Sequence, residues 1–250
     1  PEYQWNDYEG VDVKGKTVVI LVNDPGYATK NKQLFEGNTM TYYGRWVYKY
    51  EEAARQGAAG AIIVHETLPA SYGWNVIESS WTGAQYHLPA SEVNEAAIDV
   101  EMWISYDKAT ELMAKAGQNF EALKQQAATR EFNAFSLKMN ASIAIENTVV
   151  SSTSNNVIAT IEGSTASDEH VVYMGHWDHL GSTVIDGKKV IFNGAHDNAT
   201  GTAGLMHIAK AYKKLEQSPE RSVTFIAATA EEQGRLGSRY FANHPTMPLN

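Results

Sequence analysis

The sequence of 250 residues contains no cysteine. This absence excludes disulfide bonds, thiolate metal sites and cysteine nucleophiles, although it leaves the redox state of the compartment open. A metal ion would have to be held by His, Asp and Glu side chains. The sequence also lacks an apolar run of the roughly 20 residues that a membrane span requires. The polar opening, PEYQWNDYEG, is not a secretion signal, and without an initiator Met we expect a processed or excised piece.

Basic residues are in the minority, with 20 Lys and Arg against 29 Asp and Glu and a formal net charge of -9. The sequence has no basic stripe that could neutralise phosphates, so we expect no nucleic-acid partner. A hydrophobic content of 43% is enough to bury one sizeable core or two smaller ones in a soluble globular protein. Neither composition nor charge indicates the oligomeric state.

The first part of the sequence predicts a strand, helix, strand unit. GKTVVILVND (15–24) is a β-branched apolar run that ends in Asp-Pro-Gly, which predicts a buried strand closed by a turn. A helix over 48–56 and a second buried strand over 59–66 are predicted next. Residues 67–95 show no clear periodicity and predict a surface loop. The remaining predicted elements are a strand over 101–105 and helices over 107–115 and 120–130.

The sequence pattern changes in the second half. FSLKMNASIAI and NTVVSSTS alternate between polar and apolar residues, which predicts half-exposed antiparallel strands. Further strands are predicted over 155–163, 170–179 and 221–232, with a helix over 200–215 between the last two. Apolar strands that alternate with a helix predict an α/β layer, a sheet covered by helices. The domain boundary is placed near residue 140.

One strand end in the second half carries residue types that bind metals. His176 and Asp178 lie at the carboxyl end of the predicted strand 170–179, where open α/β sheets place their ligand-binding groups. Residues two apart in an extended segment point to the same side. His176 is therefore a candidate metal ligand, and Asp178 a carboxylate that orients its imidazole. A His-x-Asp pair also arises by chance.

Two more segments carry acidic residues that could bind a metal. Asp197 lies in a glycine-flanked turn, and its two carboxylate oxygens could bridge two cations; alternatively, Asp197 or Asn198 only caps the helix that follows. Glu231 and Glu232 end the third apolar strand. Because neighbouring side chains point in different directions, one could bind metal while the other faces the water that the metal polarises. The alternative is a solvated acidic pair.

Taken together, the motifs GHWDHLG, NGAHDNATGTAG and ATAEEQGRLGSRYF resemble three consecutive motifs of the M28 family of zinc aminopeptidases. The resemblance implies two zinc ions, with His176 bound to one, Glu232 bound to the other and Asp197 bridging them. It also implies that Glu231 is the general base, which takes a proton from a shared water and delivers it to the leaving amine. Asp178 would be the partner of His176.

The front of the chain resembles a second family, the protease-associated (PA) domain, a β-rich module often inserted in M28 peptidases. VDVKGKTVVILVND and KYEEAARQGAAGAIIVHE carry this similarity. It implies a PA domain over 1–138, which shapes access to the active site and carries no chemistry, and the first part of an M28 catalytic domain over 139–250. The expected fold class is α/β, with a β-rich PA domain followed by part of a helix-covered mixed sheet.

The match to the M28 motifs covers about residues 170–241 and leaves the site incomplete. The family pattern needs a further Asp and a further His after the paired glutamates. Residues 233–250 contain no Asp or Glu, and their one histidine, His244, comes before the expected ligands. We therefore expect both ends of the catalytic domain to lie outside this chain. Three protein ligands cannot complete two tetrahedral zincs, so weak metal binding and little or no activity are expected.

Three other histidines lie near the motifs and are not nominated as ligands: His179, His196 and His207. His196 neighbours Asp197 and should point elsewhere, and His207 falls in a predicted helix, where histidine usually packs or meets solvent.

The function that these expectations favour is an exopeptidase that removes amino-terminal residues from peptide substrates. One alternative is a carboxypeptidase or a glutaminyl-cyclase-like enzyme on the same scaffold. Another is a receptor-like binding protein that has lost the chemistry, although the five motif residues argue against it. M28 members with a PA domain are usually exported, so the resemblance implies a periplasmic or secreted location. Side-chain specificity is not readable from the sequence.

Overall fold

The structure is a computed structural model that describes residues 2–93 and 96–249. The chain divides into two compact units. Residues 1–83 and 95–146 form the first unit, and residues 84–94 and 147–250 form the second. None of the described helices combines the length and the apolar character needed to cross a membrane.

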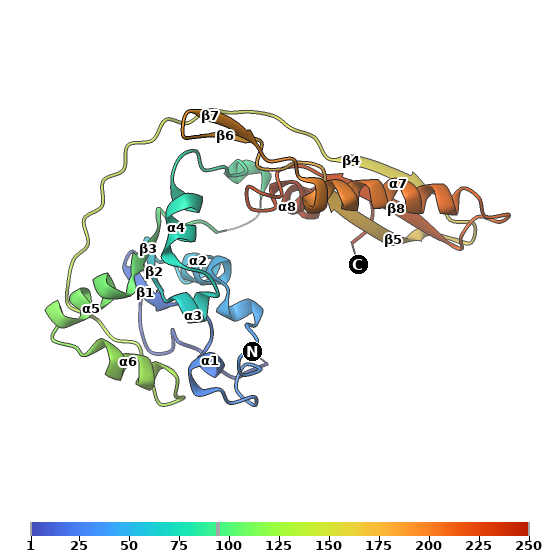
Figure 1. The fold of residues 1–250 in the computed structure, drawn as a ribbon. Helices are drawn as coiled ribbons and strands as arrows, with labels where there is room; N and C mark the ends of the chain where they lie inside the picture. The colour runs from blue at the N-terminus through green and yellow to red at the C-terminus, as the bar shows by residue number, and fades with distance from the viewer. Residues whose placement is uncertain (1, 94–95, 250) are drawn as a thin grey trace. The chain divides into compact units, whose positions relative to one another are not determined.

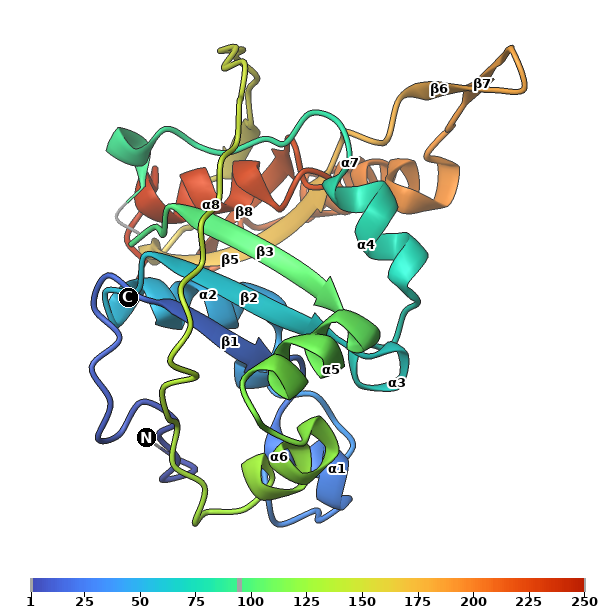
Figure 2. The ribbon, with the colours of Figure 1, turned by 90° about the vertical axis from the view of Figure 1, so that its left-hand side faces the viewer.

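A three-stranded parallel sheet organises the first unit, in the order β1-β2-β3 (Figure 2). Its central strand β2 is almost entirely buried, which explains the continuous apolar run GAIIVH. Helix α2 (Trp46–Arg55) connects β1 to β2, so the predicted strand, helix, strand unit is confirmed. The strands are β1 Thr17–Leu21, β2 Gly60–His65 and β3 Val100–Ser105.

Both faces of this sheet are covered by helices, because successive residues of β2 point to opposite sides. Ile63 packs with Tyr50 of α2 in one core cluster. Val64 packs with Ala109 and Phe120 in another, formed with helices α5 and α6. The other helices of the unit are α1 Pro25–Thr29, η1 Tyr42–Gly44, α3 Thr67–Ala70, α4 Trp74–Trp81, α5 Tyr106–Lys115 and α6 Phe120–Ala127.

Two expectations for the first unit are wrong. The α/β class is confirmed, but the unit is not β-rich, because parallel strands need long crossover connections and helices supply them. Residues 67–95 are not only a loop, since α3 and α4 lie within them. Trp74, Ile77 and Trp81 are spaced i, i+3, i+7 and pack against the core, so α4 follows a helical period hidden among polar residues.

A mixed three-stranded sheet organises the second unit, in the order β4-β8-β5 (Figure 1). β8 is central, antiparallel to β4 and parallel to β5, which confirms the predicted mixed sheet. Helix α7 lies along one face, where Leu205 packs with Val223 and Phe225 of β8. The strands are β4 Val157–Ile161, β5 Ala166–His176 and β8 Arg221–Ala228, and the helix is α7 Thr200–Tyr212.

Between β5 and α7 the chain forms a hairpin and a short helical turn, which the sequence did not predict. Asp186 and Gly187 both have positive φ, 50° and 73°, as an Asp-Gly hairpin turn requires. The hairpin strands are β6 Ser182–Ile185 and β7 Lys188–Ile191. The helical turns and the last helix of the unit are η2 Ala90–Glu92, η3 Ala195–Ala199 and α8 Leu236–Asn243.

The two alternating runs around residue 146 are not strands, contrary to expectation. Residues 132–156 contain no helix or strand. Val149 and Val150 are 89% and 81% exposed. Alternation at period two stabilises a strand only when a second strand pairs with it, and no pairing is formed over these residues.

Candidate metal site

His176 is placed by the pairing of β5 with β8. The two strands are parallel, and His176 stands opposite Ala228, so the segments that follow each strand leave the sheet at the same edge. The pairing extends one residue further, because the Trp177 amide donates to the Ala228 carbonyl at 3.0 Å. Thr202 of α7 donates its hydroxyl to the His176 carbonyl at 2.8 Å. Sheet and helix therefore hold His176, which is 8% exposed.

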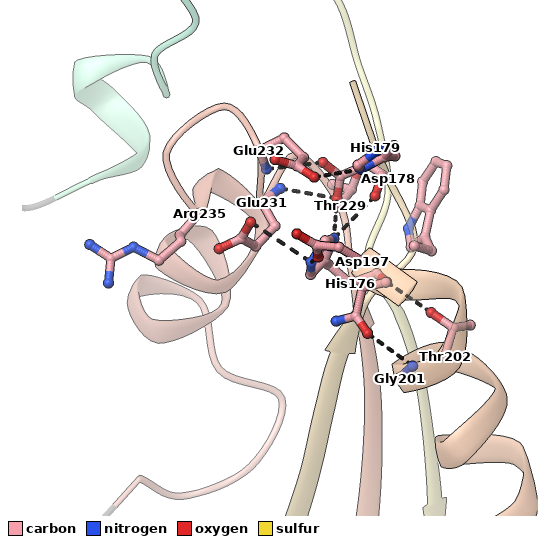
Figure 3. A network of polar contacts seen from close by, with 12 residues as sticks. His176, Asp178, His179, Asp197, Gly201, Thr202, Thr229, Glu231, Glu232 and Arg235 are labelled. Atoms are coloured by element: carbon pink, nitrogen blue, oxygen red, sulfur yellow. Dashed lines mark hydrogen bonds and ion pairs between the residues drawn. The ribbon is translucent and has the colours of Figure 1, made fainter. Parts of the chain in front are cut away.

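Asp197 reaches the same place from the turn η3, ahead of α7 (Figure 3). Its Oδ1 lies 3.0 Å from Nε2 of His176. Asn198, not Asp197, accepts the Gly201 amide at 2.9 Å at the start of α7. The helix-capping alternative therefore applies to Asn198. The Asp197 side chain is 67% exposed, so its carboxylate is open to solvent on the side away from the histidine.

Glu231 and Glu232 follow β8, and Asp178 holds both of their backbone amides. The Glu231 amide donates to Oδ1 of Asp178 at 3.0 Å, and the Glu232 amide donates to Oδ2 at 3.2 Å. Asp178 was expected to orient His176 through its carboxylate. Its Oδ1 is 3.6 Å from Nδ1 of His176, whereas its backbone carbonyl is 3.1 Å from the same nitrogen. The carboxylate of Asp178 mainly fixes the glutamates.

The contact to the Asp178 carbonyl determines which nitrogen of His176 is available. A carbonyl oxygen only accepts hydrogen bonds, so Nδ1 must carry the hydrogen. Nε2 then faces Asp197 and Glu231, at 3.0 Å and 3.8 Å from their nearest oxygens. A histidine held through Nδ1 with its Nε2 directed at carboxylates has the orientation of a metal ligand.

Charges around His176 change its basicity. Burial lowers the pKa of His176, but the Asp178 carbonyl and the carboxylates of Glu231, Asp178 and Asp197 together outweigh burial and raise the pKa above its ordinary value. The ring and three carboxylates therefore form a site that favours positive charge. A cation bound at Nε2 would supply this charge in place of a proton.

The structure brings the three predicted metal ligands together. Ligand atoms of His176, Asp197 and Glu232 all lie within 4.8 Å of one another. One imidazole nitrogen and two carboxylate oxygens are a donor set that zinc accepts. Tetrahedral zinc with bonds of about 2 Å places neighbouring ligand atoms roughly 3.3 Å apart, close to the 3.0 Å between Nε2 of His176 and Oδ1 of Asp197. The residues therefore fit a bound zinc ion.

The two glutamates occupy different environments, as expected for neighbours. Glu232 belongs to the three-residue cluster and its side chain is 16% exposed. Glu231 stands outside the cluster, and its side chain is 39% exposed. A carboxylate beside a cation site and open to solvent can reach a water molecule, which is the position that proton transfer requires.

His179 makes a contact with Glu232 that the sequence did not predict. Its Nδ1 lies 2.7 Å from Oε1 of Glu232. His179 lies within the motif GHWDHLG, but its contact with Glu232 depends on the turn after β5, and the sequence of that turn has no periodic pattern from which the contact could be predicted. Of the other histidines, His196 and His207 are exposed, and Nε2 of His244 lies 3.4 Å from Glu92.

The ends of β5 and β8 and the turn η3 thus bring a histidine and two carboxylates to one edge of an α/β sheet, with a further carboxylate beside them. This arrangement can hold a metal ion with a free carboxylate next to it. Residues 156–249 match the model of peptidase family M28, and so the M28 resemblance of the motifs is confirmed over this segment.

Individual relatives extend the comparison. A "Probable zinc metalloprotease" of Leptosphaeria maculans is 35% identical over 88 residues, 35% of this chain and 20% of that protein. "Aminopeptidase NAALADL1" of Mus musculus is 32% identical over 103 residues, 40% of this chain and 12% of that protein. The chain therefore spans a fifth or less of the length of these curated relatives. A solved M28 peptidase precursor from Shewanella amazonensis covers 93% of this chain and 43% of its own, at 21% identity and a TM-score of 0.31.

Proposed function

We propose that this chain carries the metal-binding part of a zinc aminopeptidase that removes amino-terminal residues from peptides. The observation that supports this most is the convergence of His176, Asp197 and Glu232, from two strand ends and the turn η3, to within 4.8 Å. The M28 match over 156–249 supports the peptidase chemistry. The names of the two relatives, a zinc metalloprotease and an aminopeptidase, support the metal and the substrate class.

In this proposal His176, Asp197 and Glu232 hold zinc. With two zinc ions, Asp197 would bridge them, His176 would bind the first and Glu232 the second. The exposure of the Asp197 carboxylate is consistent with a bridging role, because one of its oxygens is not buried against His176. When bound, zinc would polarise the scissile carbonyl and lower the pKa of a nearby water.

Glu231 is proposed as the general base. Its Oε2 lies 3.8 Å from Nε2 of His176, so the carboxylate is next to the cation site without belonging to the ligand cluster. It would take the proton of the attacking water and later deliver it to the leaving amine. Asp178 would keep this carboxylate in place through the Glu231 amide.

For the rest of the chain we propose a PA domain over 1–138, followed by the first part of the catalytic domain over 139–250. The separate parallel sheet of the first unit, which contains none of the metal ligands, supports a module without chemistry. A periplasmic or secreted location is proposed on the same family resemblance.

An assay with amino acid p-nitroanilides tests the proposal on a longer natural polypeptide that contains this chain. We expect cleavage only when the substrate amine is free, and loss of activity with a zinc chelator that added zinc reverses. Glu231→Gln should lower kcat by about 100-fold or more, the usual contribution of a general base, while Glu216→Gln, at an exposed position, should leave it unchanged. Activity that survives both chelation and Glu231→Gln contradicts the mechanism. Cleavage of amine-blocked peptides at their carboxyl end would favour a carboxypeptidase.

A further inference from the structure

His179 occupies a defined position between two of the loops that carry the metal ligands. Its Nδ1 is 2.7 Å from Oε1 of Glu232, which follows β8. On its other side the ring lies against Gly194, which opens the turn that bears Asp197. The His179 and Glu232 side chains are 23% and 16% exposed, so solvent competes only partly for their contact.

The glycine at 194 is what makes room for this ring. A Cβ atom at that position would lie 2.8 Å from Cγ of His179, closer than real Cβ atoms approach, and 3.0 Å from its Cβ, which is also tight. Gly194 also has a φ of 61°, a conformation that other residues adopt with strain. The turn and the ring are therefore fitted to one another.

Glu232 is fixed at two points. Asp178 accepts its backbone amide at 3.2 Å, and His179 meets its carboxylate. A carboxylate only accepts hydrogen bonds when it is ionised, so Nδ1 of His179 is the donor in this pair. With one lone pair of Oε1 engaged by His179, the remaining lone pairs of the carboxylate are available to a cation. A free glutamate side chain would instead sample several rotamers, which costs metal affinity.

We propose that His179 is a positioning residue that holds the carboxylate of Glu232 in its metal-binding orientation by donating a hydrogen bond from Nδ1. This inference rests on the proposed function, because it assumes that Glu232 is a ligand. The role is distinct from ligation: His179 acts through Glu232. Partners of this kind typically contribute 10- to 100-fold to metal affinity.

Two amide substitutions separate positioning from ligation and from packing. The amide nitrogen of asparagine is attached at the same carbon as Nδ1 of histidine, so His179→Asn keeps a donor in place. The amide nitrogen of glutamine lies farther along the side chain, so His179→Gln is polar and of similar size but misplaces the donor. His207→Leu, at an exposed position on α7, serves as the control. Circular dichroism checks that each variant is folded.

The measurement is the zinc affinity of this chain by calorimetry, starting from metal-free protein. We expect His179→Gln to weaken zinc binding by about 10- to 100-fold, with His179→Asn and His207→Leu close to wild type. Equal affinity of the Gln variant and the wild type overturns the positioning role. Equal losses in the Asn and Gln variants also overturn it, since they indicate that the imidazole itself binds zinc. Glu232→Gln should abolish the zinc binding; if it does not, or if the wild type binds no zinc, the proposed metal site fails and His179 has no ligand to position.

Discussion

At the scale of single residues, Asp178 connects the two halves of the site. Its carbonyl meets His176, and its carboxylate accepts the backbone amides of Glu231 and Glu232. Hydrogen bonds to an ionised carboxylate are among the stronger ones in proteins. The Asp178 side chain thereby sets the positions of Glu232, a proposed metal ligand, and of Glu231, the proposed base. Asp178 itself is neither a ligand nor the base.

Asp178→Asn is predicted to loosen this connection. An asparagine amide nitrogen would face one of the two backbone amides, so one donor loses its acceptor and meets another donor. We expect a loss of about 1–3 kcal/mol in the free energy of unfolding, the usual penalty for an unsatisfied group, together with weaker zinc binding. Urea unfolding followed by circular dichroism measures the first effect and calorimetry the second.

Asp186→Asn is the matched control for this change. It removes the same charge from the exposed turn of the β6–β7 hairpin, where asparagine tolerates the positive φ of 50°. Its unfolding curve should overlay that of the wild type. An Asp178→Asn variant that is as stable as this control would show that the two amide contacts contribute nothing.

The residues of the site were largely predictable, and their contacts were not. Their places at predicted strand ends or before a predicted helix make His176, Asp197 and the Glu231–Glu232 pair candidates. The choice of Glu232 as ligand and Glu231 as base comes from the resemblance to the M28 motifs. His179 was set aside, because its contact with Glu232 joins positions far apart in the sequence. Spacing and the M28 resemblance pair the Asp178 carboxylate with His176, and Oδ1 of Asp178 does lie 3.6 Å from Nδ1 of His176. Neither predicts the contacts to the segment that lies across the sheet.

At the scale of elements, strand β8 is the part on which the site depends. It pairs with β4 on one side and β5 on the other, and it leads directly to Glu231 and Glu232. His176 on β5 is in register with Ala228, the last residue of β8. A shift of β8 would therefore move both glutamates relative to His176.

Ile226→Ala is predicted to destabilise this strand. Ile226 has no exposed surface in this central strand. Its truncation should cost about 2–5 kcal/mol, the range for large-to-small changes in a core. Ile191→Ala makes the same substitution at a residue of the β6–β7 hairpin that is 61% exposed, and it should change stability very little. Thermal unfolding of both variants compares them, and similar losses at the two sites would refute a dominant role for β8.

Elements with strong apolar runs were predicted well, and those stabilised by irregular contacts were not. β2 and β8 stand out in the sequence because burial requires continuous apolar residues. Helix α4 is not predicted because its core-facing positions are one buried isoleucine and two partly buried tryptophans, set among serine and asparagine. The runs within 132–156 show the reverse error: their alternation is that of a strand, but without a partner strand the pattern has no structural effect.

At the scale of the whole molecule, the chain contains two units whose cores share no residue. Two core clusters belong to the first unit and one, around Leu205, Val223 and Phe225, belongs to the second. The metal ligands all lie in the second unit. Cleavage of the chain between the two units should therefore leave the residues of the metal site close to one another.

Limited proteolysis with an elastase tests this organisation. Elastases cleave after small aliphatic residues, and a protease needs an exposed backbone that is not held in a sheet. We expect the first cleavage after Val149 or Val150, which are 89% and 81% exposed in a segment without helix or strand. Val184 provides an internal comparison, since it is 69% exposed but paired with Lys189 in the hairpin, and it should be cut later. Mass spectrometry of the early products identifies the site.

The double variant Val149→Asp, Val150→Asp should slow the first cleavage without changing thermal stability, because neither side chain is buried. Early cleavage after Val184 instead would mean that the β6–β7 hairpin opens more often than the protease reaches the segment around Val149 and Val150. The zinc affinity of the nicked protein then tests whether the second unit alone holds the metal ligands. If His176, Asp197 and Glu232 are held by the second unit alone, as its separate core indicates, the affinity should equal that of the intact chain. A nicked protein that loses zinc binding would show instead that the intact connection between the units is needed to keep the site together.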